Sequence, residues 1–269
     1  DRIGTSHHVI DVRPEMVWNS LRKQAVYIDE PYADGSAIPT FLLAREARKY
    51  VTVLLAGEGG DEVFAGYDTH LAFKFRHLYL KLPVFIRRLL AESVRHLPVS
   101  HRKLSLEFKL KRFFEAAEND PGASHFRWRE VASPDLVREL TGSFPGREDC
   151  GEEIFRQAYS SLTKHDPIGR LSTVDCLYHL PDDLMIKCDR MTMAFSLETR
   201  VPFTDIDLVR FVMSLPDKIR FPGRRKKYLL RKSLRGLLPT PVLNKKKVGL
   251  EMPYSAWFCR QWKDEAAEI

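Results

Sequence analysis

The fold is decided by the stretch Val51-Thr-Val-Leu-Leu-Ala-Gly-Glu-Gly-Gly-Asp-Glu-Val-Phe-Ala-Gly-Tyr67. Its first part, from Val51 to Leu55, is β-branched and apolar, which predicts a strand buried on both faces, as in parallel sheets. In open α/β sheets, ligands bind just beyond the carboxyl ends of such strands. The stretch therefore predicts an α/β fold with a ligand site in the residues that follow the strand.

The turn after this strand is rich in glycine and in acidic residues. It contains Gly57, Gly59 and Gly60 together with Glu58, Asp61 and Glu62. Glycine lets a backbone approach a ligand closely and adopts positive φ without strain. Clustered carboxylates without cysteine suit a hard cation such as Mg2+, which usually arrives with phosphates. The turn therefore predicts a site for nucleotide phosphates and magnesium.

Composition sets the broad class of protein. The 269 residues are 44% hydrophobic and 29% charged, as in an ordinary globular protein of one large or two modest domains. The sequence has no apolar run near 18 residues and no signal peptide, and its start at Asp1 favours a piece of a longer chain. The four scattered cysteines favour reduced thiols and a cytoplasmic location. The net charge of +7 fits anionic small molecules, nucleic acid or an anionic membrane surface.

Periodicity, caps and prolines predict the remaining elements. A short strand is expected over His8–Val12, a helix from Pro14, and a helix over Pro39–Lys49 with Ser36 as its N-cap. From about Thr69 onward the pattern is mainly helical, with breaks at prolines that include Pro181. The helices expected there cover His70–Lys81, Val84–His96, Leu104–Glu118, Ala123–Val131, Pro134–Leu140, Glu152–Ser161, Pro167–His179, Asp183–Phe195, Asp205–Ser214, Tyr228–Leu237 and Tyr254–Ala267.

Two charged segments of the helical part hold further candidate residues. In the segment that starts at Leu180, Asp182 suits an N-cap, and the spacing of Leu184, Cys188 and Met191 predicts one buried face. Asp189 and Arg200 are candidates for ligand binding or for structural ion pairs.

The second segment opens a helix at Lys226-Lys-Tyr-Leu-Leu-Arg231. A lysine is a point charge suited to phosphate oxygens, although a solvated basic face is the alternative. The densest basic clusters are Arg224–Lys227 and Lys245–Lys247. The histidine spacing gives no zinc signature, and neither a Gly-x-Ser-x-Gly elbow nor a Walker-type phosphate loop occurs.

These segments together resemble, in order, the synthetase domain of glutamine-dependent asparagine synthetases. The matching residues are Gly4-Thr-Ser-His7, Asp29-Glu-Pro31 with Asp34 and Ser36, Gly57-Glu-Gly-Gly-Asp-Glu62 with Gly66-Tyr67, Leu180-Pro-Asp-Asp-Leu184, Asp189-Arg-Met191, Glu198-Thr-Arg-Val-Pro-Phe203 with Asp205, Lys227-Tyr-Leu-Leu-Arg231, Leu238-Pro239, and Lys247-Val-Gly249 before Pro253 and Trp257. Residues 70–165 carry little of the resemblance.

The resemblance implies a truncated parallel sheet of the adenine-nucleotide-hydrolase-like, or PP-loop ATPase, fold. Residues 1–269 would be the C-terminal part of one such domain, with an α/β portion over 1–68 that holds the strand 51–55 and a mainly helical portion over 69–269. The implied reaction uses ATP and Mg2+ to activate the side-chain carboxylate of aspartate as an acyl-adenylate, which ammonia then attacks. The ammonia would come from glutamine, hydrolysed by a glutaminase domain of the same full-length chain. A homodimer is considered, and neither nucleic acid nor membrane is expected as a partner.

The resemblance also assigns roles to residues. Glu58 would act in adenylate formation and ammonia handling, Asp61 would hold Mg2+, and Lys227 would neutralise charge that grows on the phosphates. The backbone at the nucleotide would come from Ala56, Gly57, Gly59 and Gly60, together with Asp61. Substrate contacts would come from Glu30, Asp189 and Arg200.

The sequence departs from the family pattern at several places. The family usually has serine at Ala56, leucine at Thr204 and phenylalanine at Leu250. Its Ser-Gly-Gly-x-Asp-Ser loop, which grips pyrophosphate, is not found in this chain, and by analogy it precedes residue 1. We therefore expect this piece alone to be unable to make the adenylate. The alternatives are a related amidotransferase or an amide or β-lactam synthetase for another carboxylate, a non-catalytic binding protein of the same fold, and an RNA-modifying ATPase.

Overall fold

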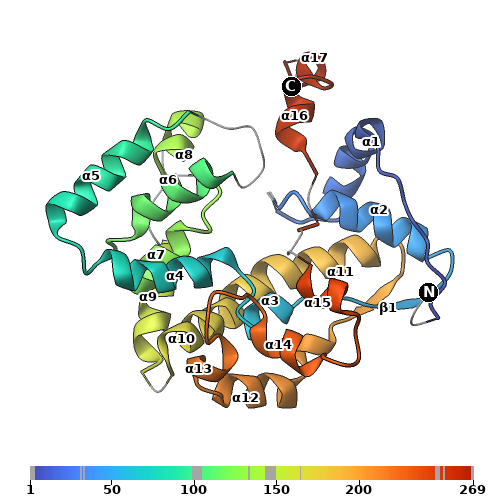
Figure 1. The fold of residues 1–269 in the computed structure, drawn as a ribbon. Coiled ribbons are helices and arrows are strands. Elements are labelled where there is room, and N and C mark those ends of the chain that lie inside the picture. The colour runs from blue at the N-terminus through green and yellow to red at the C-terminus, as the bar shows by residue number, and fades with distance from the viewer. Residues whose placement is uncertain are drawn as a thin grey trace. The chain divides into compact units, whose positions relative to one another are not determined.

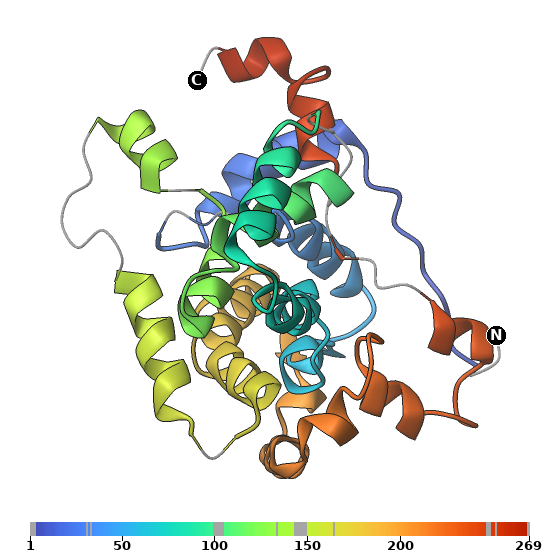
Figure 2. The same cartoon turned by 60° about the vertical axis from the view of Figure 1, so that its left-hand side comes forward.

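The computed structural model describes residues 4–30, 32, 34–98, 105–132, 134–142, 150–163, 165–245, 249–250 and 252–267. Figures 1 and 2 show these residues as a mainly helical chain. The chain forms two compact units. The first comprises Asp1–Ala56, Asp182–Pro202 and Lys246–Ile269, and the second comprises Gly57–Pro181 and Phe203–Lys245. No helix in the described part of the chain is long and apolar enough to cross a membrane.

The first unit combines two strands with helices from three separate segments of the chain. Its elements are α1 (Pro14–Ala25), α2 (Ala37–Ala47), β1 (Val53–Leu55), α11 (Ile186–Met193), β2 (Glu198–Arg200), α16 (Tyr254–Phe258) and α17 (Lys263–Ala267). Val17 of α1 and Leu42 of α2 form one core cluster with Trp262. This cluster brings the C-terminal segment against the first two helices.

The sheet is parallel, which confirms the predicted α/β fold class. Within the described residues it has two strands, with Leu54 of β1 opposite Thr199 of β2. The prediction of a strand buried on both faces is wrong, because the side chains of Val53 and Leu55 are 40% and 72% exposed. Neighbouring strands pair along the edges of a strand, so the faces of β1 are buried only where other elements pack on them. The expected strand over His8–Val12 is also wrong, since these residues have no regular structure.

A buried lysine joins α2 to α11. Lys187 of α11 is 6% exposed, and its Nζ lies 2.9 Å from Oδ2 of Asp34 and 2.7 Å from Oγ of Ser36. Burial acts to raise the pKa of the Asp34 carboxyl, but Lys187 and Ser36 outweigh it and hold the pKa below its usual value. Ser36 is the N-cap residue of α2, as predicted, but its hydroxyl donates to Asp34 and makes no capping bond to the first turn. Cys188 and Met191 lie on the buried face of α11, as predicted.

The second unit is almost wholly helical, as the sequence predicts. Its elements are α3 (Gly60–Val63), α4 (Asp68–Tyr79), α5 (Val84–Arg95), α6 (Leu106–Ala116), α7 (Pro121–Arg127), α8 (Pro134–Thr141), α9 (Cys150–Ser161), α10 (Pro167–Val174), α12 (Ile206–Ser214), α13 (Asp217–Arg220), α14 (Tyr228–Ser233) and α15 (Thr240–Asn244). The largest core cluster contains Ile168, Leu171 and Val174 of α10, packed with Phe155 of α9 and Phe221. The 3-10 turn η2 (Pro202–Thr204) leads from β2 toward α12.

The helix after α10 differs from the sequence prediction. Residues Asp175–Met185 form a π-helix, η1, which runs without a break into α11. The predicted break at Pro181 and the predicted N-cap at Asp182 are therefore wrong. A π-helix pairs residues five apart and has a wider turn, so a proline ring clashes less with the preceding turn than it would in an α-helix.

The other predicted helices are present with shifted ends. The helix expected over Tyr254–Ala267 divides into α16 and α17. The first residue of the expected helix Leu104–Glu118 lies outside the described residues. Cys176, Cys188 and Cys259 are free thiols. That the whole chain belongs to a single domain remains a prediction.

Because Lys187 is buried in an ion pair with Asp34, its replacement should strongly lower the stability of the protein. Lys187→Met should lower the free energy of unfolding by about 3 kcal/mol, because Asp34 loses its buried cation. Arg190→Met is the matched control on the same helix, since Arg190 forms an exposed pair with Asp29 at 2.5 Å. Exposed pairs contribute less than about 1 kcal/mol. Urea denaturation of both variants checks this, and equal effects would contradict a structural role for Lys187.

Candidate functional site

The glycine-rich turn follows β1 and leads into α3. Gly59 has a φ of +81°, a left-handed conformation that a side chain would strain. A Cβ at Gly59 would lie 2.8 Å from Cγ2 of Thr204, and one at Gly60 would lie 3.1 Å from the Phe203 ring. A Cβ at Gly57 would meet no atom of the described residues within 4 Å. Packing therefore requires Gly59 and Gly60, whereas Gly57 leaves its backbone open to approach.

Asp61 and Lys227 come together beside this turn. The Nζ of Lys227 lies 3.1 Å from Oδ1 of Asp61, and both side chains are partly exposed. Gly66 makes room for the pair, because a Cβ there would lie 1.8 Å from Oδ1 of Asp61 and 2.7 Å from Cε of Lys227. The backbone N–H of Gly66 also donates to the carbonyl of Asp61 at 2.8 Å. The structure thus joins two charged residues that the sequence separates widely, at a point where no larger residue than glycine fits.

Lys227 adopts an unusual backbone conformation. Its φ of 52° and ψ of 37° lie in the left-handed region, at the residue immediately before α14. A non-glycine residue there costs on the order of 1 kcal/mol. Such strain persists only where the surrounding structure imposes it, and it concentrates at functional sites. Here it accompanies the approach of the Lys227 amine to Asp61.

The three acidic residues of the turn have different environments. Glu58 is partly exposed, and no ion pair with another described residue involves it. Glu62 is 1% exposed and accepts a hydrogen bond from the hydroxyl of Tyr67. Burial raises the pKa of the Glu62 carboxyl, although the bond from Tyr67 partly opposes it. Glu62 is therefore a structural residue, and the carboxylates open to a ligand or cation are those of Glu58 and Asp61.

A buried polar network continues from Tyr67. The guanidinium of Arg129 lies 4.1 Å from the centre of the Tyr67 ring and donates to Oδ2 of Asp175 at 2.7 Å. Nε2 of His70 lies 3.1 Å from Oδ2 of Asp175, and Nε2 of His125 lies 2.6 Å from its Oδ1. Burial acts to raise the pKa of Asp175, but Arg129 and His125 hold it well below its usual value. Burial lowers the pKa of His70, and lowers that of His125 to about 4.

The two histidines and Asp175 also have the composition of a metal site. One donor atom from each lies within 4.8 Å of the others, and all three side chains are buried. A divalent cation there would lie beside the Arg129 guanidinium, which already satisfies the Asp175 carboxylate. The charges therefore favour a structural ion-pair network over a metal site. The spacing of the histidines in the sequence does not reveal this network.

The remaining predicted residues belong to the first unit. The N–H of Ala56 donates to the carbonyl of Arg200 at 2.9 Å and so extends the strand pairing. The Arg200 side chain forms an exposed ion pair with Glu198 at 2.8 Å. Asp189 is exposed on α11, and Glu30 is exposed in the loop that follows α1. These residues are accessible, and their proposed roles in substrate binding remain predictions.

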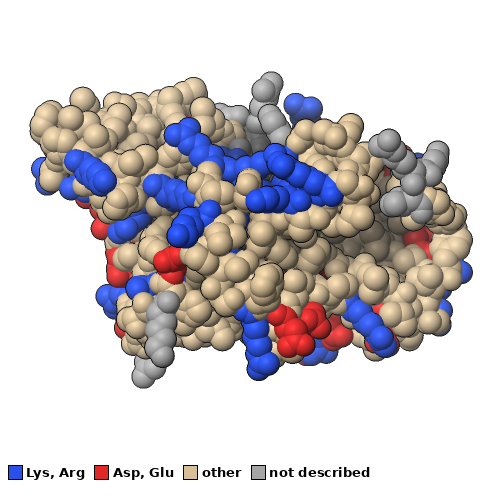
Figure 3. All heavy atoms as spheres, turned by 60° about the horizontal axis from the view of Figure 1, so that its bottom comes forward, with Lys and Arg blue, Asp and Glu red and all other residues tan. Residues whose placement is uncertain are grey.

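The basic cluster around Lys227 has largely structural contacts. A hollow of about 320 Å³ beside α14 and α15 is lined by Arg225, Arg231, Lys232 and Arg235, among others. Arg225 and Arg231 both donate to the backbone carbonyl of Leu243, so they fasten α15 to α14. Lys and Arg side chains also gather on the face shown in Figure 3. Lys246 and Lys247 of the second predicted cluster lie outside the described residues.

Sequence reasoning assigned no role to Gly66, Phe203 or Thr204, although all three shape the site. Phe203 and Thr204 come directly after the Glu198-Thr-Arg-Val-Pro segment and pack on the two glycines of the turn. Both the glycine-rich turn and the segment before Phe203 could be identified in the sequence. Their contact can be seen only in the folded structure.

Comparison with known proteins relates the sequence to one family. Residues 1–269 match the asparagine synthase family. The chain is 30% identical to glutamine-hydrolyzing asparagine synthetase 1 of Bacillus subtilis over 258 residues, which are 96% of this chain and 40% of that protein. It is 31% identical to a putative glutamine-hydrolyzing asparagine synthetase of Mycobacterium bovis over 262 residues, 95% of this chain and 37% of that protein. The chain thus spans at most 40% of the length of these two curated relatives. Proteins with these names are ligases.

The lack of space at Gly66 predicts that any side chain at this position lowers the stability of the protein. Gly66→Ala should displace Asp61 or Lys227, since the new Cβ would overlap Oδ1 of Asp61. We expect a loss of about 1–3 kcal/mol of unfolding free energy, as for overpacked sites. Gly57→Ala is the control, because its Cβ would enter open space and should change stability by less than about 0.5 kcal/mol. Denaturant titration of both variants checks this, and a harmless Gly66→Ala would mean that the pair does not depend on the glycine.

The buried histidines predict the direction of a pH effect. An unfolded histidine has a pKa of about 6.5, whereas that of folded His125 is about 4. Between these values the unfolded chain binds more protons, so stability should fall as pH decreases from about 6.5 to about 4. His125→Gln should flatten this dependence, and His77→Gln on the exposed face of α4 should not. The measurement is the denaturant midpoint of unfolding between about pH 4 and about pH 6.5. A midpoint that rises toward low pH would contradict a neutral, buried His125.

Proposed function

Because the chain belongs to the asparagine synthase family, we propose that the complete protein forms an amide with the help of ATP. The proposed acceptor is the side-chain carboxylate of aspartate, and the products are asparagine, AMP and pyrophosphate. Ammonia would come from glutamine through a glutaminase domain, as the names of the relatives suggest for those proteins.

The observation that carries the proposal is the contact of Asp61 with Lys227 beside an open glycine turn. A carboxylate oxygen is a ligand that Mg2+ prefers, and the partly exposed Asp61 supplies one. Magnesium, when bound, offsets negative charge on phosphate oxygens. The Lys227 amine supplies a second positive charge, and the exposed backbone of Gly57 offers close approach, while the packed Gly59 and Gly60 shape the turn. These residues therefore fit a magnesium-bound triphosphate, with Ala56 contributing its carbonyl.

In the first proposed step an aspartate carboxylate oxygen forms a bond to the α-phosphorus of ATP. The bond from that phosphorus to the bridging oxygen breaks, and pyrophosphate leaves with the electron pair. Lys227 would neutralise the charge that grows on the leaving group, so its effect falls mainly on the transition state. The product is an acyl-adenylate. Glu30, Asp189 and Arg200 are the proposed contacts of the acceptor.

In the second proposed step the lone pair of ammonia attacks the acyl carbon. The bond to the AMP oxygen then breaks, and AMP leaves with its electron pair. The nitrogen loses one proton, and Glu58 is the proposed acceptor of that proton. Glu58 suits this role because it lies in the same turn as Asp61, is partly exposed, and is not committed to an ion pair within the described residues.

Glu58→Gln in the full-length protein tests the proposal. We expect the variant to form the amide about 100-fold or more slowly, the usual effect of removing a general base. Glu92→Gln, on the exposed surface of α5, is the matched control and should leave the rate unchanged. The measurement is amide formation from ATP, ammonium and a panel of carboxylates.

Each outcome of this assay has a meaning. Activity with aspartate alone supports asparagine synthesis, whereas activity with another carboxylate assigns the protein to a related amide synthetase. A wild-type protein that is inactive with every carboxylate would favour a non-catalytic binding protein. Full activity of Glu58→Gln would remove Glu58 from the mechanism.

A further inference from the structure

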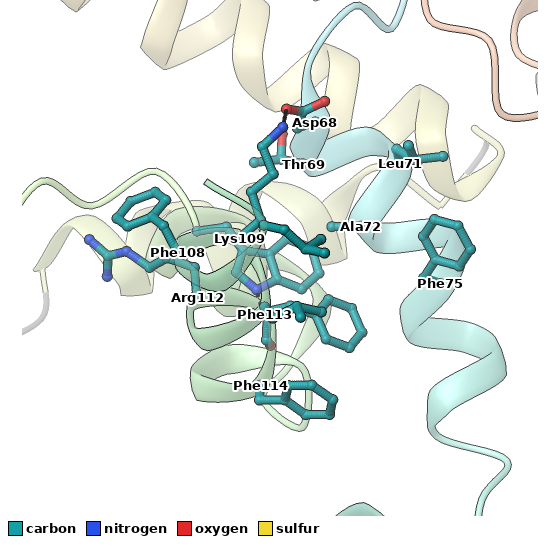
Figure 4. A pocket seen from close by; sticks show the side chains of 13 residues that line it. Asp68, Thr69, Leu71, Ala72, Phe75, Phe108, Lys109, Arg112, Phe113 and Phe114 are labelled. Carbon is teal, nitrogen blue, oxygen red and sulfur yellow. Dashed lines mark hydrogen bonds and ion pairs between the residues drawn. The ribbon is translucent and has the colours of Figure 1, made fainter. Parts of the chain in front are cut away.

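A second hollow lies in the helical unit, mainly in a stretch without the motifs quoted in the sequence analysis. It is a cavity of about 420 Å³ between α4 and α6, closed by Trp128 at the end of α7. Figure 4 shows phenylalanine rings from both helices around it. Its apolar lining residues are Leu71, Ala72, Phe75, Leu106, Phe108, Leu110, Phe113, Phe114 and Trp128. Its size and its apolar walls are typical of a small-molecule site.

The aromatic wall is held in place by ring contacts. The rings of Phe113 and Trp128 are stacked with their centres 5.9 Å apart, and Phe113 meets Phe114 edge to face at 5.3 Å. Such pairs favour one arrangement of the rings. By contrast, Phe108 and Leu106 at the opening are largely exposed to water. The cavity therefore joins a pre-formed interior to an apolar opening whose exposure a ligand would reduce.

The opening also carries charge. Nζ of Lys109 lies 2.8 Å from Oδ2 of Asp68, and Nζ of Lys226 lies 2.5 Å from Oδ1 of the same carboxylate. Figure 4 shows Lys109 reaching toward Asp68 at one end of the cavity. The two lysines hold the pKa of Asp68 below its usual value, although partial burial acts to raise it. Arg112 adds a further positive charge among the lining residues.

The double pairing of Asp68 matters for a ligand. If Lys109 turns to another anion, Asp68 keeps its contact with Lys226 and is not left as an unpaired carboxylate. The Arg112 guanidinium is less available to a ligand than the Lys109 amine, because it donates to the carbonyl of Glu130 and lies 3.6 Å from Glu115. Lys109 is therefore the cation that can be redirected at little cost.

We propose that this cavity binds a small monocarboxylate with an aromatic or aliphatic body. The body would fill the space between Phe113, Phe114 and Phe75, and the carboxylate would form an ion pair with the Nζ of Lys109. A partner helix, about 10 Å across with its side chains, would need a long groove instead of a cavity of this volume. The lining residues include neither Asp61 nor Lys227, so the proposal does not depend on the proposed function.

Displacement of a fluorescent probe from the full-length protein tests this site. The probe is 1-anilinonaphthalene-8-sulfonate, and the competitors are naphthalene-1-carboxylate and the neutral naphthalene-1-methanol. We expect one saturable probe site, with the carboxylate binding at least tenfold more tightly than the alcohol. A hydrogen bond to a charged group contributes about 1.5–3 kcal/mol, which corresponds to roughly 10- to 100-fold in affinity.

Three variants locate the site. Ala72→Trp should fill the cavity and abolish binding of both competitors. Lys109→Gln should weaken the carboxylate about tenfold or more and leave the alcohol unchanged. Lys111→Gln is the matched control on α6, since Lys111 pairs with Glu107 and is not among the residues that line the cavity. It should change neither affinity.

Several results would overturn the proposal. Absence of saturable binding to the wild-type protein, or unchanged binding to a folded Ala72→Trp, would mean that the cavity is not the site. Equal affinity for carboxylate and alcohol would contradict the role of Lys109. If Ala72→Trp does not fold, the comparison of Lys109→Gln with Lys111→Gln decides, and equal effects of these two variants would reject the site.

Discussion

The ion pair between Asp61 and Lys227 is the interaction on which the candidate site depends. As a partly exposed pair it adds little to stability. Its importance is positional, because it brings a carboxylate from the glycine turn and an amine from a distant segment within 3.1 Å of each other. The missing side chain of Gly66 makes room for this approach, and the left-handed backbone of Lys227 accompanies it. The strained backbone of Lys227 thus accompanies the placement of two opposite charges near the exposed backbone of Gly57.

The site rests on a buried polar layer that fixes its position. Glu62 is the residue after Asp61, and its bond to Tyr67 ties the turn to the ring that Arg129 covers. Arg129 in turn neutralises Asp175, which also holds His70 and His125. Electrostatic catalysis needs groups that do not reorganise during the reaction. The ion pairs of Asp175 with Arg129 and the two histidines are one way to supply that rigidity, since a buried charge would be costly to leave without its partners.

Sequence reasoning singled out candidate residues of the turn more readily than it predicted the packing around them. The turn after β1 and the lysine before α14 were identifiable because glycines, acids and a basic helix start have distinct local chemistry. The burial of β1 was predicted wrongly, since apolar residues in a strand do not reveal which elements pack on its two faces. The strand β2 was missed because Glu198-Thr-Arg carries no apolar alternation, and its pairing with β1 is a tertiary contact.

Other features could not be read from the sequence for the same physical reason. His70, His125 and Asp175 come from three different helices, so no spacing rule relates them. Asp34 and Ser36 are far from Lys187 in the sequence, so only the fold brings them together. Pro181 signalled a helix end, whereas the chain forms a π-helix through it. The aromatic cavity lies in a region without motifs, where only the assembled helices create a space.

A double-mutant cycle on Asp61 and Lys227, read by ATP–pyrophosphate exchange in the full-length protein, tests the central claim most directly. Asp61→Asn and Lys227→Met should each slow exchange by about 10²–10³-fold. If the two residues act as one unit on the phosphates, the double variant should be little slower than either single variant. Effects that multiply in the double variant, or a single variant that exchanges at the wild-type rate, would contradict the account.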